Sequence, residues 1–169
     1  MPSEMKLNLG CGDKKKDGYL NVDICGTPDL LCDLSSFPWP WADNSADEVF
    51  SERFLEHVED YAKTMLEIHR ILKPGGTIWF KVPHFRSPMV AWHLHHYQFS
   101  TFSPELLCES RPYQWGGKRL FRKISLRINY VWIRPVFGRF LGWLANLSPF
   151  RWDWLGLPVD EVEFKGAKC

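Results

Sequence analysis

The chain has 169 residues, 45% hydrophobic and 24% charged, which predicts one globular domain with its own core. Its five cysteines are scattered without a Cys-x-x-Cys pair, which argues against a disulfide framework or a zinc site and favours a reducing, cytoplasmic compartment. The N-terminus has no apolar run after a charged start and no apolar run is long enough to cross a bilayer, so we expect neither a signal peptide nor a membrane span.

Charge divides the chain into two parts. Residues 1–100 hold ten Lys and Arg against fourteen Asp and Glu, a net charge of −4. Residues 101–169 hold eleven against six, a net charge of +5, and no acid occurs between Glu109 and Asp153. This asymmetry predicts an anionic partner for the second part. The nine tryptophans and twelve phenylalanines indicate either a large apolar pocket or an apolar surface that meets a partner.

The chain opens with a predicted strand over residues 5–10, a glycine turn and a second strand over residues 19–24. Gly10 and Gly12 let the backbone approach a ligand, and Asp23 at the end of the second strand is placed to accept hydrogen bonds from ribose hydroxyls. A glycine pair alone also fits any tight turn. The residues between Gly12 and Tyr19 are too few for a full crossover helix, so we expect a helix of one or two turns, or a loop.

An alternation of strands and a helix follows. Residues 29–34 and 47–51 are predicted strands, separated by a Pro- and Trp-rich loop that is neither helix nor central strand. Apolar residues at helical spacing predict a helix from Glu52 to about Leu72, ended by the Pro-Gly-Gly that follows, and residues 77–82 form a fifth strand. Glu56 then lies in the first helical turn, where an acid complements the helix dipole, while Glu52 is a candidate for facing a substrate.

These segments resemble the class I S-adenosylmethionine-dependent methyltransferases. The similarity lies in Leu-Asn-Leu-Gly-Cys-Gly at residues 7–12 with Asn-Val-Asp at 21–23, in Ser-x-x-x-x-Glu-His at 51–57, and in Leu-Lys-Pro-Gly-Gly at 72–76. It implies an α/β fold with a Rossmann-like sheet, mostly parallel with an antiparallel last strand, and S-adenosylmethionine as cofactor. Residues 10–12 would cradle its amino acid part, Asp23 the ribose and Asp33-Leu34 the adenine. The full set of cofactor-binding residues that the resemblance implies is Leu9, Gly10, Cys11, Gly12, Asp23, Ile24, Asp33, Leu34 and Ser51.

The second half is predicted to add a substrate-side cover and two more strands. A histidine- and aromatic-rich loop precedes a short helix at 103–107, with Ser103 as N-cap and Pro104 in its first position. Strands over 126–133 and 159–164 would complete a seven-stranded sheet as an antiparallel edge. Between them, residues 135–147 form an aromatic helical insertion, with Arg139 and Asn146 on the side opposite its apolar face.

A catalytic base is needed only if the methyl acceptor is a hydroxyl or a protonated amine. Histidine titrates nearest to neutral pH, and the candidates are His84 and His96, expected where the sheet's carboxyl edge meets the cover, and His57. A packed or surface histidine is the alternative for each. His93, His95 and His96 match no ligand pattern, so we expect no metal.

The sequence therefore predicts a single methyltransferase domain, with residues 1–83 as the cofactor-binding half and residues 84–169 as the substrate or lid half. The expected acceptor is an oxygen or nitrogen of a small molecule or sugar. A catalytically silent scaffold with this fold is an alternative, whereas the missing third glycine disfavours a nicotinamide-dependent oxidoreductase. Residues 111–151 have three interpretations: a lid over the substrate, a helix on an anionic membrane surface, which would make a cytoplasmic protein peripheral to a membrane, or a grip on RNA.

Overall fold

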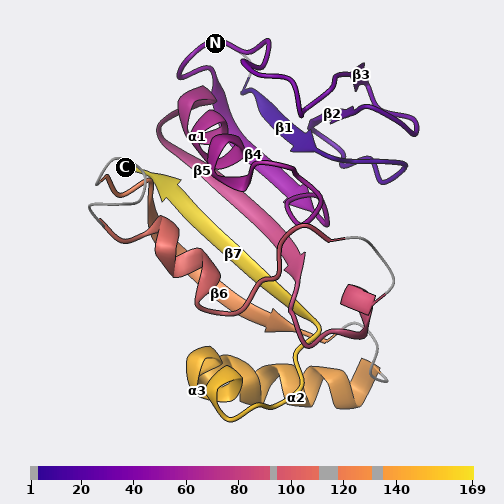
Figure 1. The fold of residues 1–169 in the computed structure, drawn as a ribbon, viewed down its shortest axis with the longest axis vertical. Helices are drawn as coiled ribbons and strands as arrows, with labels where there is room; N and C mark the ends of the chain where they lie inside the picture. Colours follow the sequence, from indigo (N-terminus) through magenta and orange to yellow (C-terminus); the bar gives the residue numbers. More distant parts are fainter. Residues whose placement is uncertain (1–3, 92–94, 111–117, 131–134) are drawn as a thin grey trace.

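The computed structural model describes residues 4–91, 95–110, 118–130 and 135–169, which build a seven-stranded sheet with the strand order β3-β2-β1-β4-β5-β7-β6. Neighbouring strands from β3 to β5 are parallel, and β7 is antiparallel to both β5 and β6 (Figure 1). The predicted mostly parallel sheet with an antiparallel last strand is confirmed. The strands are β1 (Lys6–Leu9), β2 (Leu20–Asp23), β3 (Leu30–Leu31), β4 (Ala46–Glu52), β5 (Leu72–Pro83), β6 (Phe121–Asn129) and β7 (Glu161–Lys168).

The connection between β1 and β2 is a loop without a helix, as expected from its length. A buried pair of amides holds it. The Asn21 Oδ1 accepts hydrogen bonds from Asn8 Nδ2 (2.8 Å) and from the Lys16 backbone N–H (2.7 Å), and Asn21 Nδ2 donates to Asp29 Oδ2 (2.7 Å). Because no crossover helix lies over this loop, these hydrogen bonds satisfy its buried backbone and side-chain polar groups. The side-chain amides of Asn8 and Asn21, which lie on β1 and β2, therefore hold the loop that contains the glycine turn.

The helix α1 (Tyr61–Ile71) begins nine residues later than the predicted helix from Glu52, which was wrong at this end. Arg53 has a φ of 57°, a left-handed conformation that a helix does not tolerate, and residues 53–59 form turns. The Asp60 side chain accepts a hydrogen bond from the Lys63 backbone N–H (2.9 Å) and so caps α1. The helix ends before Leu72, as predicted.

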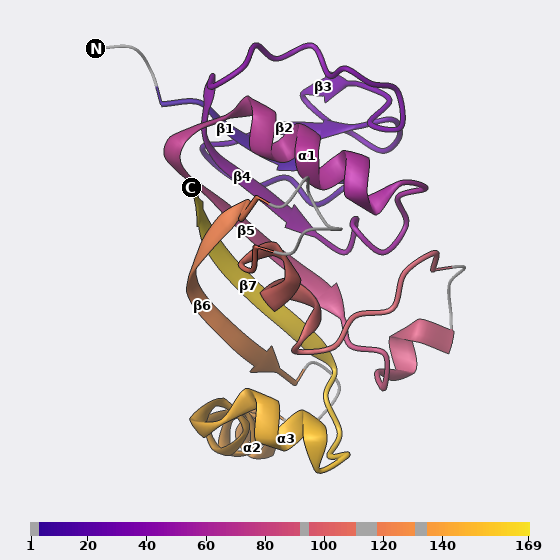
Figure 2. The ribbon, with the colours of Figure 1, turned by 60° about the vertical axis from the view of Figure 1, so that its left-hand side comes forward.

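The core lies between α1 and one face of the sheet, which Figure 2 shows from the side. The strand register places Leu7, Val49 and Ile78 in one row across β1, β4 and β5. All three are fully buried, and they share one apolar cluster with Met65 and Ile68 of α1. The helix therefore fixes the orientation of the strand ends at which a ligand site would form.

On the opposite face of the sheet, lysine side chains lie over aromatic rings. Its central row holds Asn8, Phe50 and Trp79, and Lys16 Nζ lies 4.5 Å from the Phe50 ring centroid and 4.7 Å from that of Trp79. Lys165 of β7 also lies over Trp79, at 5.7 Å. Lysine side chains thus cover the aromatic rings on this face.

The helices α2 (Pro135–Leu147) and α3 (Pro149–Trp154) lie beyond the end of β6 (Figures 1 and 2). The predicted helical insertion over 135–147 is confirmed, but the orientation predicted for Asn146 was wrong. The Asn146 amide accepts from the Ile128 N–H and donates to the Ile128 C=O, both at 2.8 Å. It thereby satisfies backbone groups on the open side of the edge strand β6.

Several element boundaries also differ from the predictions. β6 begins at Phe121 instead of Leu126, because β7 continues to Lys168 and pairs with it over this length. Residues 103–107 form a 3₁₀ helix, and Ser103 lies inside it as an acceptor for the Ser100 N–H instead of capping it. A further 3₁₀ helix spans Pro88–Ala91. In the part of the chain that the structure describes, no helix is both long and apolar enough to cross a bilayer.

Candidate functional site

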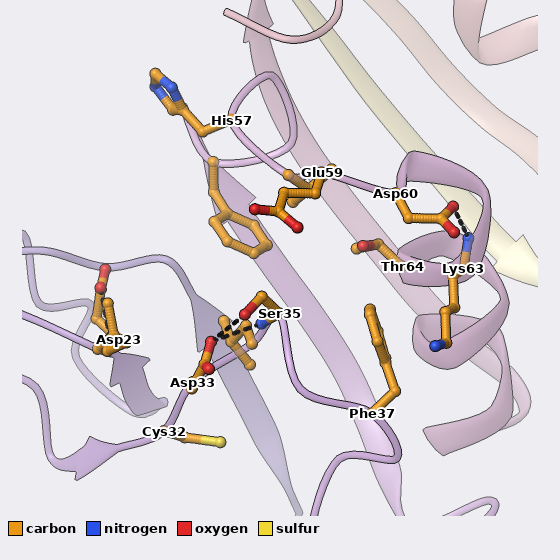
Figure 3. A pocket seen from close by; sticks show the side chains of 14 residues that line it. Asp23, Cys32, Asp33, Ser35, Phe37, His57, Glu59, Asp60, Lys63 and Thr64 are labelled. Carbon is orange, nitrogen blue, oxygen red and sulfur yellow. Dashed lines mark hydrogen bonds between the residues drawn. The ribbon is translucent and has the colours of Figure 1, made fainter. Parts of the chain in front are cut away.

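A cavity of about 380 Å³ opens at the carboxyl ends of β2 and β4, beside the glycine turn. Figure 3 shows Asp23 and Asp33 on one side of this cavity and Asp60, Lys63 and Thr64 on the other. Four carboxylates and one lysine make its polar lining predominantly acidic. The lining residues are Asp23, Ile24, Cys32, Asp33, Leu34, Ser35, Phe37, Phe54, His57, Val58, Glu59, Asp60, Lys63 and Thr64.

The two glycines of the turn are needed for different reasons. Gly10 has a φ of 68°, and a Cβ added there would lie 2.4 Å from Cγ of Phe54, a wall residue of the cavity. Gly12 has a φ of 52°, and a Cβ there would meet no atom of the described residues within 4 Å. Gly10 is therefore required for packing against Phe54, whereas Gly12 leaves open space in front of the backbone.

Asp23 holds the glycine turn in place. Its Oδ2 accepts a hydrogen bond from the Gly12 N–H (2.7 Å), and its Oδ1 accepts from the N–H groups of Ile24 (2.7 Å) and Cys25 (3.2 Å). The Cys25 Sγ also lies 3.6 Å from Oδ1, whereas Oδ2 accepts from Gly12 alone among the described residues, so Oδ2 can still accept from a ligand. The Ile24 side chain, 65% exposed, lies on the rim.

Asp33 and Leu34 follow β3 in the chain and line one wall of the cavity. The Asp33 carboxylate accepts from the Ser35 hydroxyl (2.6 Å), the Ser35 N–H (2.9 Å) and the Ser36 hydroxyl (2.9 Å). These hydrogen bonds, that of the Ser35 side chain first, lower the pKa of the carboxyl below its usual value. The buried Leu34 and the Phe37 ring supply the apolar part of this wall.

The cavity includes residues that the sequence predictions missed. Glu59, Asp60, Lys63 and Thr64 come from the first turn of α1 and the turn before it. They were missed because the helix was predicted to start at Glu52. Asp60 followed by a helical apolar pattern is an N-cap signal that could have located them. Phe37 and Phe54 carry no sequence signal of their own beyond being aromatic.

Of the three histidines predicted for catalysis, His57 lines the cavity, with 42% of its side chain exposed. His84 is fully buried outside it, where Nδ1 accepts from the Arg86 N–H (3.2 Å) and Nε2 lies 3.3 Å from Asp153 Oδ1. Burial lowers the pKa of His84. His96 is exposed and does not line the cavity. The structure therefore does not bring these three side chains together.

Three predicted cofactor contacts have buried side chains. Leu9 is fully buried in the core and Cys11 is 6% exposed. Ser51 is 1% exposed, and its Oγ has no hydrogen-bond partner among the described residues. None of the three side chains lines the cavity.

Glu56 was wrongly placed in the first turn of a helix. It precedes α1 and is 1% exposed, and burial raises its pKa to about 7. Its backbone C=O accepts hydrogen bonds from the N–H groups of His96 (2.9 Å) and Tyr97 (3.3 Å). The carboxylate is therefore part of the interior next to the cavity instead of a solvated dipole partner.

Part of the chain matches a known protein family. Residues 7–80 match the family model described as a methyltransferase domain. The dimethylglycine N-methyltransferase of Parasynechococcus marenigrum (strain WH8102) is 32% identical over 111 residues, which cover 65% of this chain. The chain spans 40% of the length of that relative.

Solved structures share the fold at low sequence identity. An S-adenosylmethionine-dependent methyltransferase from Archaeoglobus fulgidus has a TM-score of 0.60 at 15% identity, covering 99% of this chain and 87% of that one. The phosphoethanolamine N-methyltransferase 2 of Haemonchus contortus, in complex with phosphomonomethylethanolamine and S-adenosylhomocysteine, has a TM-score of 0.57 at 17% identity. The match covers 99% of this chain and 49% of that protein.

Proposed function

We propose that this protein transfers the methyl group of S-adenosylmethionine to an oxygen or nitrogen of a small molecule or sugar. The premise is that residues 7–80 match the family model of the methyltransferase domain and that the chain has the class I methyltransferase fold. The observation that carries the proposal is the acidic cavity beside the glycine turn. Two of the relatives are named for N-methylation, which supports nitrogen as the acceptor atom.

The residues of the cavity fit this cofactor. The open space at Gly12 is a cradle that a Cβ would fill, so the backbone can approach the amino acid part. Asp23, fixed by three backbone N–H groups, is oriented to accept from ribose hydroxyls. Leu34 and Phe37 offer an apolar wall for the adenine. The excess of carboxylates favours a cationic ligand.

When bound, S-adenosylmethionine supplies a methyl group already activated by the sulfonium charge. The task of this chain is then to hold cofactor and acceptor in line and to keep water out. His57 lines the cavity, and we assign its side chain to the part of the cavity where the methyl acceptor would bind. A proton acceptor is required there only for a hydroxyl or an ammonium acceptor.

The test is calorimetric titration with S-adenosylmethionine, S-adenosylhomocysteine and NAD. We expect both adenosyl ligands to bind and NAD not to bind. Asp23→Asn should weaken adenosyl binding by about tenfold or more, because one hydrogen-bond acceptor is lost. Asp17→Asn is the matched control, since Asp17 is exposed in the same loop but does not line the cavity. NAD binding without adenosyl binding would refute the proposal, and adenosyl binding without transfer to any acceptor would favour a silent scaffold.

An anionic membrane surface is the partner that the described part of residues 111–151 favours. Phe140, Trp143 and Leu147 of α2 are 54%, 61% and 66% exposed, and Arg139, which directly precedes Phe140, is also exposed. Aromatic and basic side chains together on one helix are typical of interfacial binding. Trp154 of α3 is 81% exposed as well.

Flotation with liposomes that contain anionic lipid tests this partner. We expect the protein to float with anionic vesicles and not with neutral ones, and Trp143→Ser to reduce flotation. Binding to RNA without flotation would instead support the nucleic-acid interpretation. Flotation that Trp143→Ser leaves unchanged would place the contact elsewhere on the chain.

A further inference from the structure

Three side chains of metal-ligating type meet beside the cavity. One ligand atom each of Glu56, His57 and His95 lies within 4.8 Å of the other two. The backbone explains why, since the hydrogen bonds of His96 and Tyr97 to the Glu56 C=O hold residues 95–97 alongside residues 56–57. The His57 and His95 ring centroids are 4.8 Å apart. The sequence predictions considered His93, His95 and His96 and found no ligand pattern, because the partners of His95 are distant in the chain.

The carboxylate of this cluster is buried and incompletely paired. Glu56 is 1% exposed, its Oε1 lies 4.0 Å from His57 Nε2, and its Oε2 has no hydrogen-bond partner among the described residues. The Nε atom of the neighbouring Arg53 lies 3.9 Å from Oε2 of Glu161, which is a second buried acid. The Arg53 guanidinium charge is therefore shared between Glu161 and Glu56. Buried carboxylate oxygens are normally paired or coordinate a metal, so this one points to a ligand.

We propose that Glu56, His57 and His95 bind a divalent first-row transition cation, for which Zn²⁺ is the probe. Two imidazoles and one carboxylate are a donor set that suits Zn²⁺ and Fe²⁺ and leaves coordination positions open, whereas Mg²⁺ prefers oxygen ligands. Zn²⁺ lies about 2.0–2.2 Å from its nitrogen and oxygen ligands, so the three atoms would move closer together on binding. The structure thus offers a cation site with one carboxylate ligand from the interior and imidazole ligands from two adjoining segments.

The position of His57 connects the site to the cavity. Because His57 lines the cavity, an open position on the cation would face the space beside the cofactor pocket. The cation would then bind a carboxylate or hydroxyl oxygen of the methyl acceptor and orient it. This role rests on the proposed function, but binding of the cation itself does not.

The experiment is titration calorimetry with Zn²⁺, in the absence of S-adenosylmethionine, on protein carrying Cys25→Ser and Cys169→Ser to remove the exposed thiols. We expect one Zn²⁺ to bind per chain and Mg²⁺ not to bind. Glu56→Gln and His95→Ala should each weaken Zn²⁺ binding by about tenfold or more. His96→Ala is the matched control, because His96 is the adjacent histidine outside the cluster, and it should bind Zn²⁺ like the parent.

The outcomes separate this site from the cofactor pocket. No saturable Zn²⁺ binding, or equal binding by all three variants, overturns the proposal. Thermal unfolding of each variant shows whether it is folded, and either Glu56→Gln or His95→Ala suffices for the comparison. Glu56→Gln should still bind S-adenosylhomocysteine. Zn²⁺ binding by a parent that binds no adenosyl ligand would support the metal site and reject the proposed function.

Discussion

Replacing each glycine of the turn by alanine separates packing from ligand binding. At Gly10, the left-handed backbone costs about 1–2 kcal/mol for a residue with a Cβ. The overlap with the Phe54 ring adds about 1–3 kcal/mol, since the Cβ would lie 2.4 Å from that ring. At Gly12 the backbone cost is similar, but the Cβ would meet no described atom within 4 Å. Gly10→Ala should therefore be about 1–3 kcal/mol less stable than Gly12→Ala.

The assay is thermal unfolding without ligand, followed by titration with S-adenosylhomocysteine. For a domain of this size about 1 kcal/mol corresponds to a Tm shift of about 2–4 °C, so the two variants should differ by about 2–12 °C. Gly12→Ala should remain folded yet lose adenosyl binding, because its methyl group would occupy the ligand space. Equal Tm values would refute the packing argument, and normal adenosyl binding by Gly12→Ala would refute the assignment of the cradle.

Three further changes test the surroundings of the site. Glu67→Gln should lower the free energy of unfolding by about 2–3 kcal/mol, because Glu67 accepts two hydrogen bonds from Arg70. In this variant Arg70 still has other hydrogen-bond acceptors, so its charge is not left unpaired. The Arg70 side chain lowers the pKa of Glu67, so in urea titrations this difference should be present above about pH 4.3 and vanish as the pH falls through the folded pKa. Asp153→Ala should cost about 3 kcal/mol and speed hydrogen exchange at the Thr101 amide, which donates to Asp153 (3.0 Å); unchanged exchange would contradict this. Burial lowers the pKa of His84, so the unfolded chain binds that proton first and stability should fall below about pH 6.5, and His84→Asn should reduce this slope.

The sequence predicted the parts of the fold that depend on local patterns. The glycine turn, the absence of a full crossover helix after it and the α/β alternation followed from residue types and spacing, and the structure confirms them. The contacts proposed for Asp23 and Asp33 stay predictions, although both acids line the cavity.

What local patterns could not supply was the consequence of distant contacts. The periodicity from Glu52 onward looked helical, but the left-handed Arg53 and the hydrogen bonds from His96 and Tyr97 to Glu56 hold that segment as turns. The amphipathic pattern predicted Asn146 on the side opposite the apolar face, yet the open edge of β6 provides it with two backbone partners. In both cases tertiary hydrogen bonds override the amphipathic pattern.

The lysine layer over the aromatic face of the sheet affects how the chain tolerates mutation. Trp79 lies beneath three lysines, Lys16, Lys81 and Lys165, and each such contact is worth about 0.5–1 kcal/mol at an exposed position. Loss of one lysine leaves two others over the ring, so the contribution is redundant. Loss of Trp79 removes the ring that all three lysines share, although Lys16 still lies over Phe50. On this face, the three lysine positions should therefore tolerate many substitutions, whereas the Trp79 position should tolerate few.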